Sequence, residues 1–314
     1  MTHTPRLNRR ELITLINTTP RLALQYYKED IWEQYASIAE TLKAAARGDK
    51  NINIQDLIDL VVFSEMLKSG CPPKITLHLY SHSGRIAEPW REAGYTPILI
   101  DNGFESHRLV EGSAEKLPNL YKFSLSTENI NLLPLHQELD FLSAEPPCDK
   151  LSRAGAKHWK KEPEGTFQRH ASRLLSTINF CRENGKTSYV EQPIIRGVYK
   201  SPTTPHPMIP EPTNKIEPHS FAMLSDDPRA ESYTKRTWLW LSGFSLVTRG
   251  ETIHPVEVNR TTRLRGGSNK RKRSVMPQGL SRAVNIDAMK SIMTEAEPPP
   301  TPNWYNPALE DPTK

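Results

Sequence analysis

Short apolar segments alternate with amphipathic segments along much of this 314-residue chain, and this alternation constrains the fold more than any other feature. The segments expected to be strands are 75–81, 96–101, 141–144, 188–190 and 237–241, and the clearest helices between them are 85–93 and 166–183, each followed by a glycine. Strands that alternate with helices form a mostly parallel sheet. We therefore expect an α/β domain over residues 72–294.

The flanks of this domain have different compositions. Residues 28–47 and 53–69 are expected to be helices, which predicts a helical N-terminal extension over residues 1–71. Eight prolines between residues 193 and 228 predict an excursion that is neither helix nor central strand. Six more prolines after residue 297 predict an extended or disordered tail over residues 295–314.

Positive charge is concentrated in one part of the chain. Residues 229–273 hold eleven Lys or Arg and three Glu, whereas the whole chain has a net charge of +5. The segment either contacts the phosphates of a polyanion or is a solvated basic loop, and we keep both interpretations. Under the first, a short basic region over residues 241–273 contacts DNA, and the expected contacts are Arg263, Arg265, Lys270, Arg271, Lys272 and Arg273.

Several classes of protein are excluded by composition. No apolar stretch approaches the roughly 20 residues that a membrane span needs, and the N-terminus lacks the apolar core of a signal peptide. The chain has three cysteines, an odd and widely spaced set that fits neither a disulfide framework nor a cysteine zinc site. We expect a cytoplasmic protein with reduced thiols, without a metal and without a membrane partner.

The segment 77–84 (Leu-His-Leu-Tyr-Ser-His-Ser-Gly) runs from an expected strand through a turn of small residues into an expected helix. In α/β proteins such a turn holds nucleotides beyond the carboxyl end of the strand. Asp101 ends the next expected strand, where an acid accepts hydrogen bonds from ribose hydroxyls. One glycine and one acid also occur together by chance in many α/β proteins, so the residues alone leave both interpretations open.

Three chemical groups are placed next to later strands. Cys148 follows the third expected strand in a Pro-Pro-Cys sequence, and is either a nucleophile or a buried core thiol. Glu191 ends the fourth, and is either an acid for a substrate ring or a solvated carboxylate. Arg236 precedes the fifth and can anchor an anion or a substrate.

Taken in chain order, these motifs resemble the DNA (cytosine-5) methyltransferase family, and most closely its compact, phage-like branch. The resemblance runs from about residue 76 to residue 293 and is most specific over 146–159 (Pro-Pro-Cys-Asp-Lys-Leu-Ser-Arg-Ala-Gly-Ala-Lys-His-Trp) and 233–240. It implies a Rossmann-like methyltransferase fold, S-adenosylmethionine as the cofactor, and DNA as the partner, with the target base flipped out of the duplex.

The resemblance also implies a role for each site residue. Cys148 matches the nucleophile that adds to C6 of cytosine, Glu191 matches the acid that holds and protonates the ring at N3, and Arg236 matches a basic residue beside the flipped base. The addition makes C5 nucleophilic enough to take a methyl group. The positions that match the cofactor site are Tyr80, Ser81, His82, Ser83, Gly84, Asp101 and Pro146.

Several positions depart from the family pattern. His82 stands where the family turn has its first glycine, Gln192 where asparagine follows the glutamate, and Trp238 where an arginine is usual. Three hypotheses therefore stay open: a DNA cytosine-5 methyltransferase, a catalytically degenerate methyltransferase fold that binds DNA or another partner, and an enzyme for another modification at pyrimidine C5. We further expect a monomer in the cytoplasm of a bacterium or of a phage-infected host cell.

Overall fold

A computed structural model describes most of the α/β region. The described residues are 37, 40, 41, 43–45, 47–69, 72–102, 110–111, 119–126, 129–152, 163–193, 209–249 and 276–296. The six expected DNA contacts between residues 263 and 273, and the tail beyond residue 296, lie outside these ranges, so what we expect of them stays a prediction.

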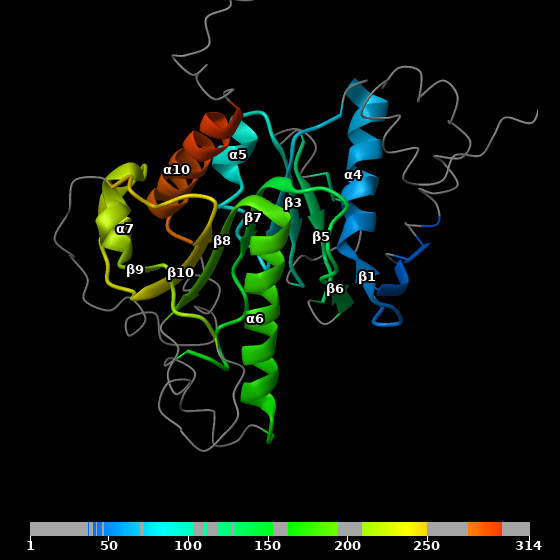
Figure 1. The fold of residues 1–314 in the computed structure, drawn as a ribbon, viewed down its shortest axis with the longest axis horizontal. Helices are drawn as coiled ribbons and strands as arrows, with labels where there is room; N and C mark the ends of the chain where they lie inside the picture. Colours follow the sequence, from blue (N-terminus) through cyan, green and yellow to red (C-terminus); the bar gives the residue numbers. More distant parts are fainter. Residues whose placement is uncertain are drawn as a thin grey trace, which may run out of the picture.

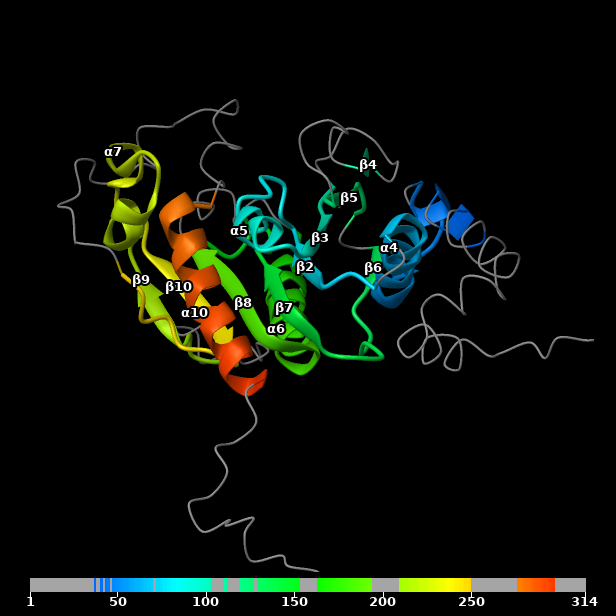
Figure 2. The same cartoon turned by 90° about the horizontal axis from the view of Figure 1, so that it is seen from above.

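Within the described residues, eight strands form one sheet (Figure 1). In hydrogen-bonded order they are β4 (Val110–Glu111), β5 (Tyr121–Phe123), β3 (Thr96–Ile100), β2 (Ile75–Leu79), β7 (Leu139–Ala144), β8 (Gly185–Pro193), β10 (Thr237–Ser242) and β9 (Asn214–Ile216). Seen from above, they follow one another in this order across the molecule (Figure 2). A separate parallel pair joins β1 (Ile52–Asn53) to β6 (Ile130–Asn131).

Most neighbouring strands of the sheet run parallel to one another. Strands β5, β3, β2, β7 and β8 are parallel to one another, and β10 runs antiparallel between β8 and β9. The chain passes from β2 to β3 on one side and later to β7 on the other, so the strand order reverses between β2 and β7. Such a reversal opens a crevice beyond the carboxyl ends of the strands, as in Rossmann-like sheets. The expected α/β fold with a mostly parallel sheet is confirmed.

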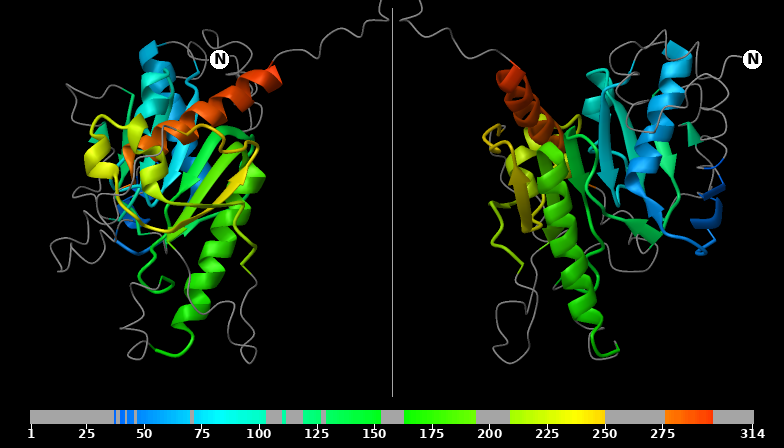
Figure 3. Two further views of the ribbon diagram at one scale, coloured as in Figure 1. Left: turned by 90° about the vertical axis from the view of Figure 1, so that its left-hand side faces the viewer. Right: turned by 45° about the vertical axis from the view of Figure 1, so that its right-hand side comes forward.

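Helices cover both faces of the sheet, and therefore every residue of β2 and β3 is buried. The helices α4 (Ile54–Ser69) and α6 (Thr166–Asn184) pack into one hydrophobic cluster with the strands. The helices α5 (Glu88–Glu92) and α10 (Gln278–Ala296) belong to a second cluster, in which Trp90 stacks on Phe141 of β7 with ring centroids 4.3 Å apart. Figure 3 shows α6 and α10 against the same part of the sheet.

The sequence-based expectations for regular elements are largely confirmed. The five expected strands correspond to β2, β3, β7, β8 and β10, and the expected helices 53–69, 85–93 and 166–183 correspond to α4, α5 and α6. Helix α4 packs its apolar residues Leu57, Leu60 and Val61 into the same cluster as Tyr121 and Phe123 of β5. The described end of the N-terminal segment therefore packs on the sheet. Among the described residues, no helix is long and apolar enough to cross a membrane.

The proline-rich excursion holds more regular structure than expected. Its described part contains the edge strand β9, a 3₁₀ helix η3 (Pro218–Leu224) and the start of α7 (Pro228–Glu231), so the expectation that it is not helical is wrong. Pro218 and Pro228 each occupy the first turn of a helix, where a backbone N–H has no partner within the helix. Proline at these positions therefore costs no hydrogen bond.

A buried carboxylate fixes the start of α10. Glu231 is 5% exposed, and its carboxylate accepts hydrogen bonds from the backbone N–H groups of Gln278 (2.5 Å) and Gly279 (2.8 Å). A Cβ at Gly279 would lie 2.0 Å from the carbonyl oxygen of Phe221, so the helix approaches η3 at a point where only glycine fits.

Replacing Glu231 with alanine should destabilise the fold. The change leaves two backbone donors without their partner and removes a negative charge from a helix N-terminus, a loss of about 1–3 kcal/mol. We expect the melting temperature, followed by circular dichroism, to fall by roughly 3–8 °C. Glu211→Ala is the matched control, because Glu211 is exposed and only pairs with Lys215 on the surface. Equal melting temperatures for the two variants would contradict this role.

Candidate functional site

Four parallel strands end at the same edge of the sheet and bring the expected site residues there. Strand β2 leads into residues 80–84, β3 ends before Asp101, and β7 and β8 carry residues 145–148 and Glu191. The backbone N–H of Glu145 donates to the carbonyl oxygen of Leu79 at 3.1 Å, which holds the loop after β7 beside the loop after β2. Segments far apart in the sequence therefore meet at this edge.

The turn after β2 has an unusual backbone at its two ends. Tyr80 takes the left-handed conformation (φ 60°), and its ring lies in the hydrophobic core, where burial raises the pKa of the phenol. Gly84 also has a positive φ (66°), and a Cβ there would lie 2.9 Å from Cδ2 of Leu99. His82 is not among the described residues with a positive φ. The histidine that departs from the family pattern therefore puts no strain on this turn.

The side chains of the turn present several polar groups. Ser81 is fully buried, and its Oγ has no hydrogen-bond partner among the described residues. Oγ of Ser83 accepts a hydrogen bond from the backbone N–H of Arg85 at 3.4 Å. Nδ1 of the exposed His82 lies 3.6 Å from Oδ1 of Asp101, whose side chain is 15% exposed. The edge thus offers an unpaired hydroxyl and a partly exposed carboxylate to a polar ligand.

A largely buried ion pair joins β8 to the segment before β10. Nζ of Lys235 lies 3.4 Å from Oε1 of Glu191, and each side chain is 15% exposed. Antiparallel pairing places Glu191 opposite Leu239 and brings Lys235 to the end of β8. Burial lowers the pKa of Lys235, but Glu191, Cys148 and Tyr233 raise it by more, so the net shift is upward. Lys235 is therefore a cation at neutral pH.

Cys148 lies directly beyond β7, in a turn whose N–H groups at Leu151 and Ser152 donate to its carbonyl oxygen. It is half-buried. Burial raises the pKa of the thiol, Lys235 acts in the opposite direction, and Glu191 raises it further. The net shift is upward, so the thiol is protonated at neutral pH in the ligand-free protein. To act as a nucleophile, Cys148 has to lose this proton when a substrate is bound.

The structure adds a residue that we did not single out from the sequence. Oε1 of Glu145 is buried and has no hydrogen-bond partner among the described residues. Burial, followed by the charges of Glu191 and Asp101, raises the pKa of Glu145 to about 8, against the opposite effect of Lys235. An acid directly after a strand was the signal that pointed to Asp101 and Glu191, and the same signal marks Glu145.

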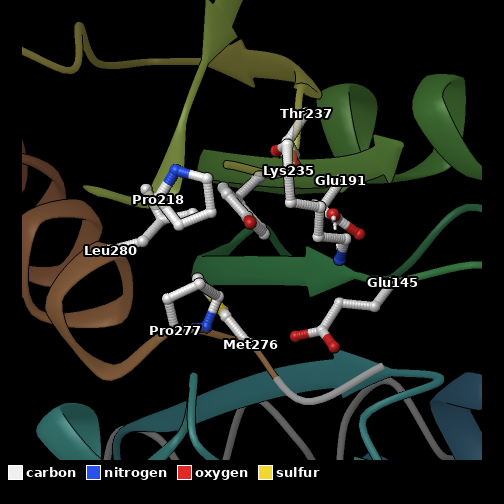
Figure 4. Close-up of a pocket in the computed structure, with 9 residues that line it drawn as sticks. Glu145, Glu191, Pro218, Lys235, Thr237, Met276, Pro277 and Leu280 are labelled. Carbon is white, nitrogen blue, oxygen red and sulfur yellow. Dashed lines mark hydrogen bonds and ion pairs between the residues drawn. The ribbon is translucent and has the colours of Figure 1, made fainter. Parts of the chain in front are cut away.

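Of these groups, Glu145, Glu191 and Lys235 line one small pocket (Figure 4). Cys148, Ser81 and Asp101 are not among its lining residues. Its empty space of about 270 Å³ includes the opening to solvent, and its enclosed part has room for about one water molecule. The lining residues are Glu145, Tyr189, Glu191, Pro218, Lys235, Thr237, Met276, Pro277 and Leu280.

Not every expected site residue reaches this pocket. Arg236 is 78% exposed and its Nε lies 3.4 Å from Oε1 of Glu217, so the structure places it away from Glu191. The basic residue beside Glu191 is the adjacent Lys235. Pro146 is buried, and its carbonyl oxygen accepts a hydrogen bond from Nε2 of Gln192 at 2.5 Å. Gln192 therefore ties the loop after β7 to β8.

No cluster of three or more His, Cys, Asp or Glu side chains suited to a metal ion occurs in the described part of the chain.

The chain has no match among protein-family models, and a search of curated proteins finds no match either. Among solved structures it resembles the 16S rRNA methyltransferase KamB (16% identity, 44% of this chain and 61% of that chain, TM-score 0.26). It also resembles the plantazolicin methyltransferase BpumL in complex with SAH (11% identity, 58% and 61% covered, TM-score 0.24). A third is an rRNA methylase from Escherichia coli (12% identity, 74% and 90% covered, TM-score 0.25).

The chain thus spans less than two thirds of the length of the first two of these proteins. TM-scores this low do not establish a shared fold, so the assignment of a Rossmann-like α/β sheet depends on the strand order and directions themselves.

Proposed function

We propose that this protein transfers a methyl group from S-adenosylmethionine to C5 of cytosine in DNA. One observation carries the proposal: Cys148, Glu191 and Lys235 meet at the carboxyl edge of the adjacent parallel strands β7 and β8. A thiol, a carboxyl group and a cation at one edge of a sheet are the groups that an addition to a pyrimidine requires. Glu191 and Lys235 line the pocket, and Cys148 lies outside its lining.

Each of the three groups has a task in this reaction. The thiolate of Cys148 adds to C6 of a flipped cytosine, and the electron pair of the C5–C6 double bond moves into the ring. The thiol proton passes to the carboxylate of Glu191, which Lys235 holds at 3.4 Å, and from there to N3, so that the charge on the ring is neutralised. Bound S-adenosylmethionine would supply the methyl group that C5 takes. C5 then loses its proton to solvent, the C5–C6 double bond re-forms as the thiolate leaves, and the N3 proton returns through Glu191 to the thiolate.

The turn after β2 and the end of β3 fit the cofactor. The unpaired buried hydroxyl of Ser81 and the partly exposed carboxylate of Asp101 are suited to polar groups of an amino acid or a ribose. The positive φ of Gly84 and its contact with Leu99 keep side chains out of this turn. S-adenosylmethionine, when bound, supplies an electrophilic methyl group on sulfur.

The alternative of a degenerate fold that only binds DNA is less well supported. Its motivation was the histidine at position 82, and the backbone there is not strained. A decayed site would have no reason to keep Cys148, Glu191 and a buried cation together. The third hypothesis, another modification at pyrimidine C5, uses the same addition step and is separated from methylation by the identity of the cofactor.

Cofactor binding tests the proposal at its first step. Isothermal titration should show micromolar binding of S-adenosylmethionine and S-adenosylhomocysteine to the wild-type protein. Asp101→Ala should weaken both at least about tenfold, because a carboxylate that accepts two hydroxyls is lost. Asp49→Ala is the control, since Asp49 is exposed and pairs only with Arg47. A folded wild-type protein that binds neither compound would contradict a methyltransferase and favour the DNA-binding alternative.

A further inference from the structure

One side chain continues the contact between β7 and β8 beyond the point where their backbone pairing ends. The last paired residues of these strands are Ala144 and Val190. Two residues further on in the same register, Pro146 corresponds to Gln192, and proline has no backbone N–H with which to extend the ladder. Nε2 of Gln192 instead donates a hydrogen bond to the carbonyl oxygen of Pro146 at 2.5 Å. The side chain thus replaces the backbone pairing at this point.

The Gln192 amide makes this contact at the expense of its own oxygen. Gln192 is fully buried, and its Oε1 has no hydrogen-bond partner among the described residues. A carbonyl oxygen accepts only from a donor, so the amide nitrogen is the atom that faces Pro146. An apolar side chain of similar shape would remove the unpaired Oε1 but leave the Pro146 oxygen unpaired instead, at a similar cost. The hydrogen bond therefore adds little to global stability, and its consequence is local: it fixes the loop after β7.

The loop that Gln192 holds carries the reactive thiol. Cys148 is two residues after Pro146, and its carbonyl oxygen accepts hydrogen bonds from the backbone N–H groups of Leu151 (3.1 Å) and Ser152 (2.7 Å). A backbone hydrogen bond of 3.1 Å joins the start of the same loop to the last residue of β2. Between these ends, the Gln192 amide supplies the bond to β8. Because two successive prolines have fixed φ angles, a constraint on the first carbonyl is passed on to Cys148.

The ion pair that acts on the thiol lies on the other side of this bond. Burial raises the pKa of Cys148 most, and among the charged groups Lys235 lowers it, whereas Glu191 and Asp149 raise it. Asp149 is next to Cys148 in the loop, but Glu191 belongs to β8 and Lys235 precedes β10. Coulomb interactions weaken with distance, so a loop that moves away from β8 reduces the effect of Lys235 on the thiol.

We propose that Gln192 is a positioning residue, whose side-chain amide holds the turn from Pro146 to Cys148 against β8 and thereby sets the place of the thiol. This inference rests on the proposed function, to which it adds the residue that orients the nucleophile. A displacement of about 1 Å from the productive geometry can reduce a rate by roughly two orders of magnitude, so a single hydrogen bond is sufficient for this role.

Alkylation of Cys148 in a double-mutant comparison tests the inference without DNA or cofactor. Iodoacetamide is applied over a range of pH, and mass spectrometry follows the peptide that contains Cys148. In the wild-type background, Lys235→Met should raise the midpoint by roughly one pH unit. In the Gln192→Met background the same change should raise it by less than about half as much, because the thiol is no longer held beside Lys235.

Methyl transfer gives a second readout. Gln192→Met keeps a side chain of similar length but has no donor, so the rate should fall by roughly 10–10²-fold while binding of S-adenosylmethionine stays within about twofold. Gln55→Met is the matched control. Gln55 is also buried (4% exposed), and its amide donates to Asp59 at 2.7 Å and accepts from the backbone N–H of His136 at 2.9 Å. This control should lower the melting temperature and leave both the rate and the alkylation midpoint unchanged.

The possible outcomes are distinguishable. If Gln192→Met does not fold, Gln192→Asn gives the same comparison, because its amide is one methylene group shorter, and its effects should have the same direction. Equal shifts by Lys235→Met in both backgrounds, or full methyl transfer by a folded Gln192 variant, would overturn the inference. If DNA is methylated and the two shifts are equal, only this inference fails. If the shift depends on Gln192 and the wild-type protein methylates no DNA, only the proposed function fails.

Discussion

Replacing Cys148 with alanine is expected to reduce methyl transfer to DNA by at least about four orders of magnitude, because the reaction then has no nucleophile to activate C5. The measurement is the transfer of a labelled methyl group from S-adenosylmethionine to DNA. Binding of the cofactor should stay within about twofold of the wild type, since the proposed cofactor groups come from the turn after β2 and from the end of β3.

Cys181 provides the matched control for this experiment. It is a second free cysteine, fully buried in α6, and burial raises the pKa of its thiol to about 12. Cys181→Ala should keep methyl transfer within a few-fold of the wild type and lower the melting temperature slightly, because a small apolar contact is lost. If Cys148→Ala retains full activity, Cys148 is not the nucleophile.

Replacing Glu191 with glutamine should produce two opposite effects. Methyl transfer should fall by roughly 10²–10⁴-fold, because an amide cannot protonate the ring. The thiol of Cys148 should become easier to ionise, because the charge of Glu191 raises its pKa in the wild-type protein. A structural defect would not produce both a slower reaction and a more reactive thiol.

Alkylation of Cys148 by iodoacetamide as a function of pH measures the second effect. In Glu191→Gln the midpoint should move to lower pH than in the wild type. In Lys235→Met it should move to higher pH, because Lys235 lowers the pKa of the thiol. Midpoints that move together in both variants, or that do not move, would contradict the electrostatic coupling of the three groups.

The central strands could be predicted from the sequence because of where they lie. Strands β2 and β3 are buried on both faces. Strand β3 is a short, mostly apolar segment, whereas β2 carries the buried polar residues Thr76 and His78 between its apolar ones. The carboxyl ends of parallel strands share one edge, and therefore Asp101 and Glu191, which the sequence places at strand ends, lie at the same edge of the sheet. By contrast, β9 and η3 lie among prolines, where sequence patterns argue against regular structure.

Lys235 and Arg236 show a limit of sequence interpretation. Both precede β10. Which of the two side chains faces the pocket depends on the alternation of side chains along this strand. Side chains alternate between faces, so Lys235 shares a face with the pocket residue Thr237, and Arg236 points to solvent and Glu217. The residue types alone do not show which of the two side chains lies on the pocket face.

Glu145 directly follows a strand, as Asp101 does, so its place at the sheet edge could be recognised from the sequence, but its unpaired oxygen could not. The resemblance to a family directs attention to positions that match its pattern, and this glutamate matches none of them. Its importance comes from burial and from an unpaired oxygen, which are properties of the fold. The basic segment over residues 263–273 remains a predicted DNA contact.

Trapping of the covalent adduct tests the central claim most directly. DNA in which 5-fluorodeoxycytidine replaces cytosine offers every sequence context, and fluorine at C5 blocks the proton loss that releases the enzyme. The protein incubated with this DNA and S-adenosylmethionine should form a stable complex whose modified peptide, identified by mass spectrometry, contains Cys148. The Cys148→Ala variant should form none. A wild-type protein that binds the cofactor and DNA but forms no adduct, or an adduct at another residue, would contradict the account.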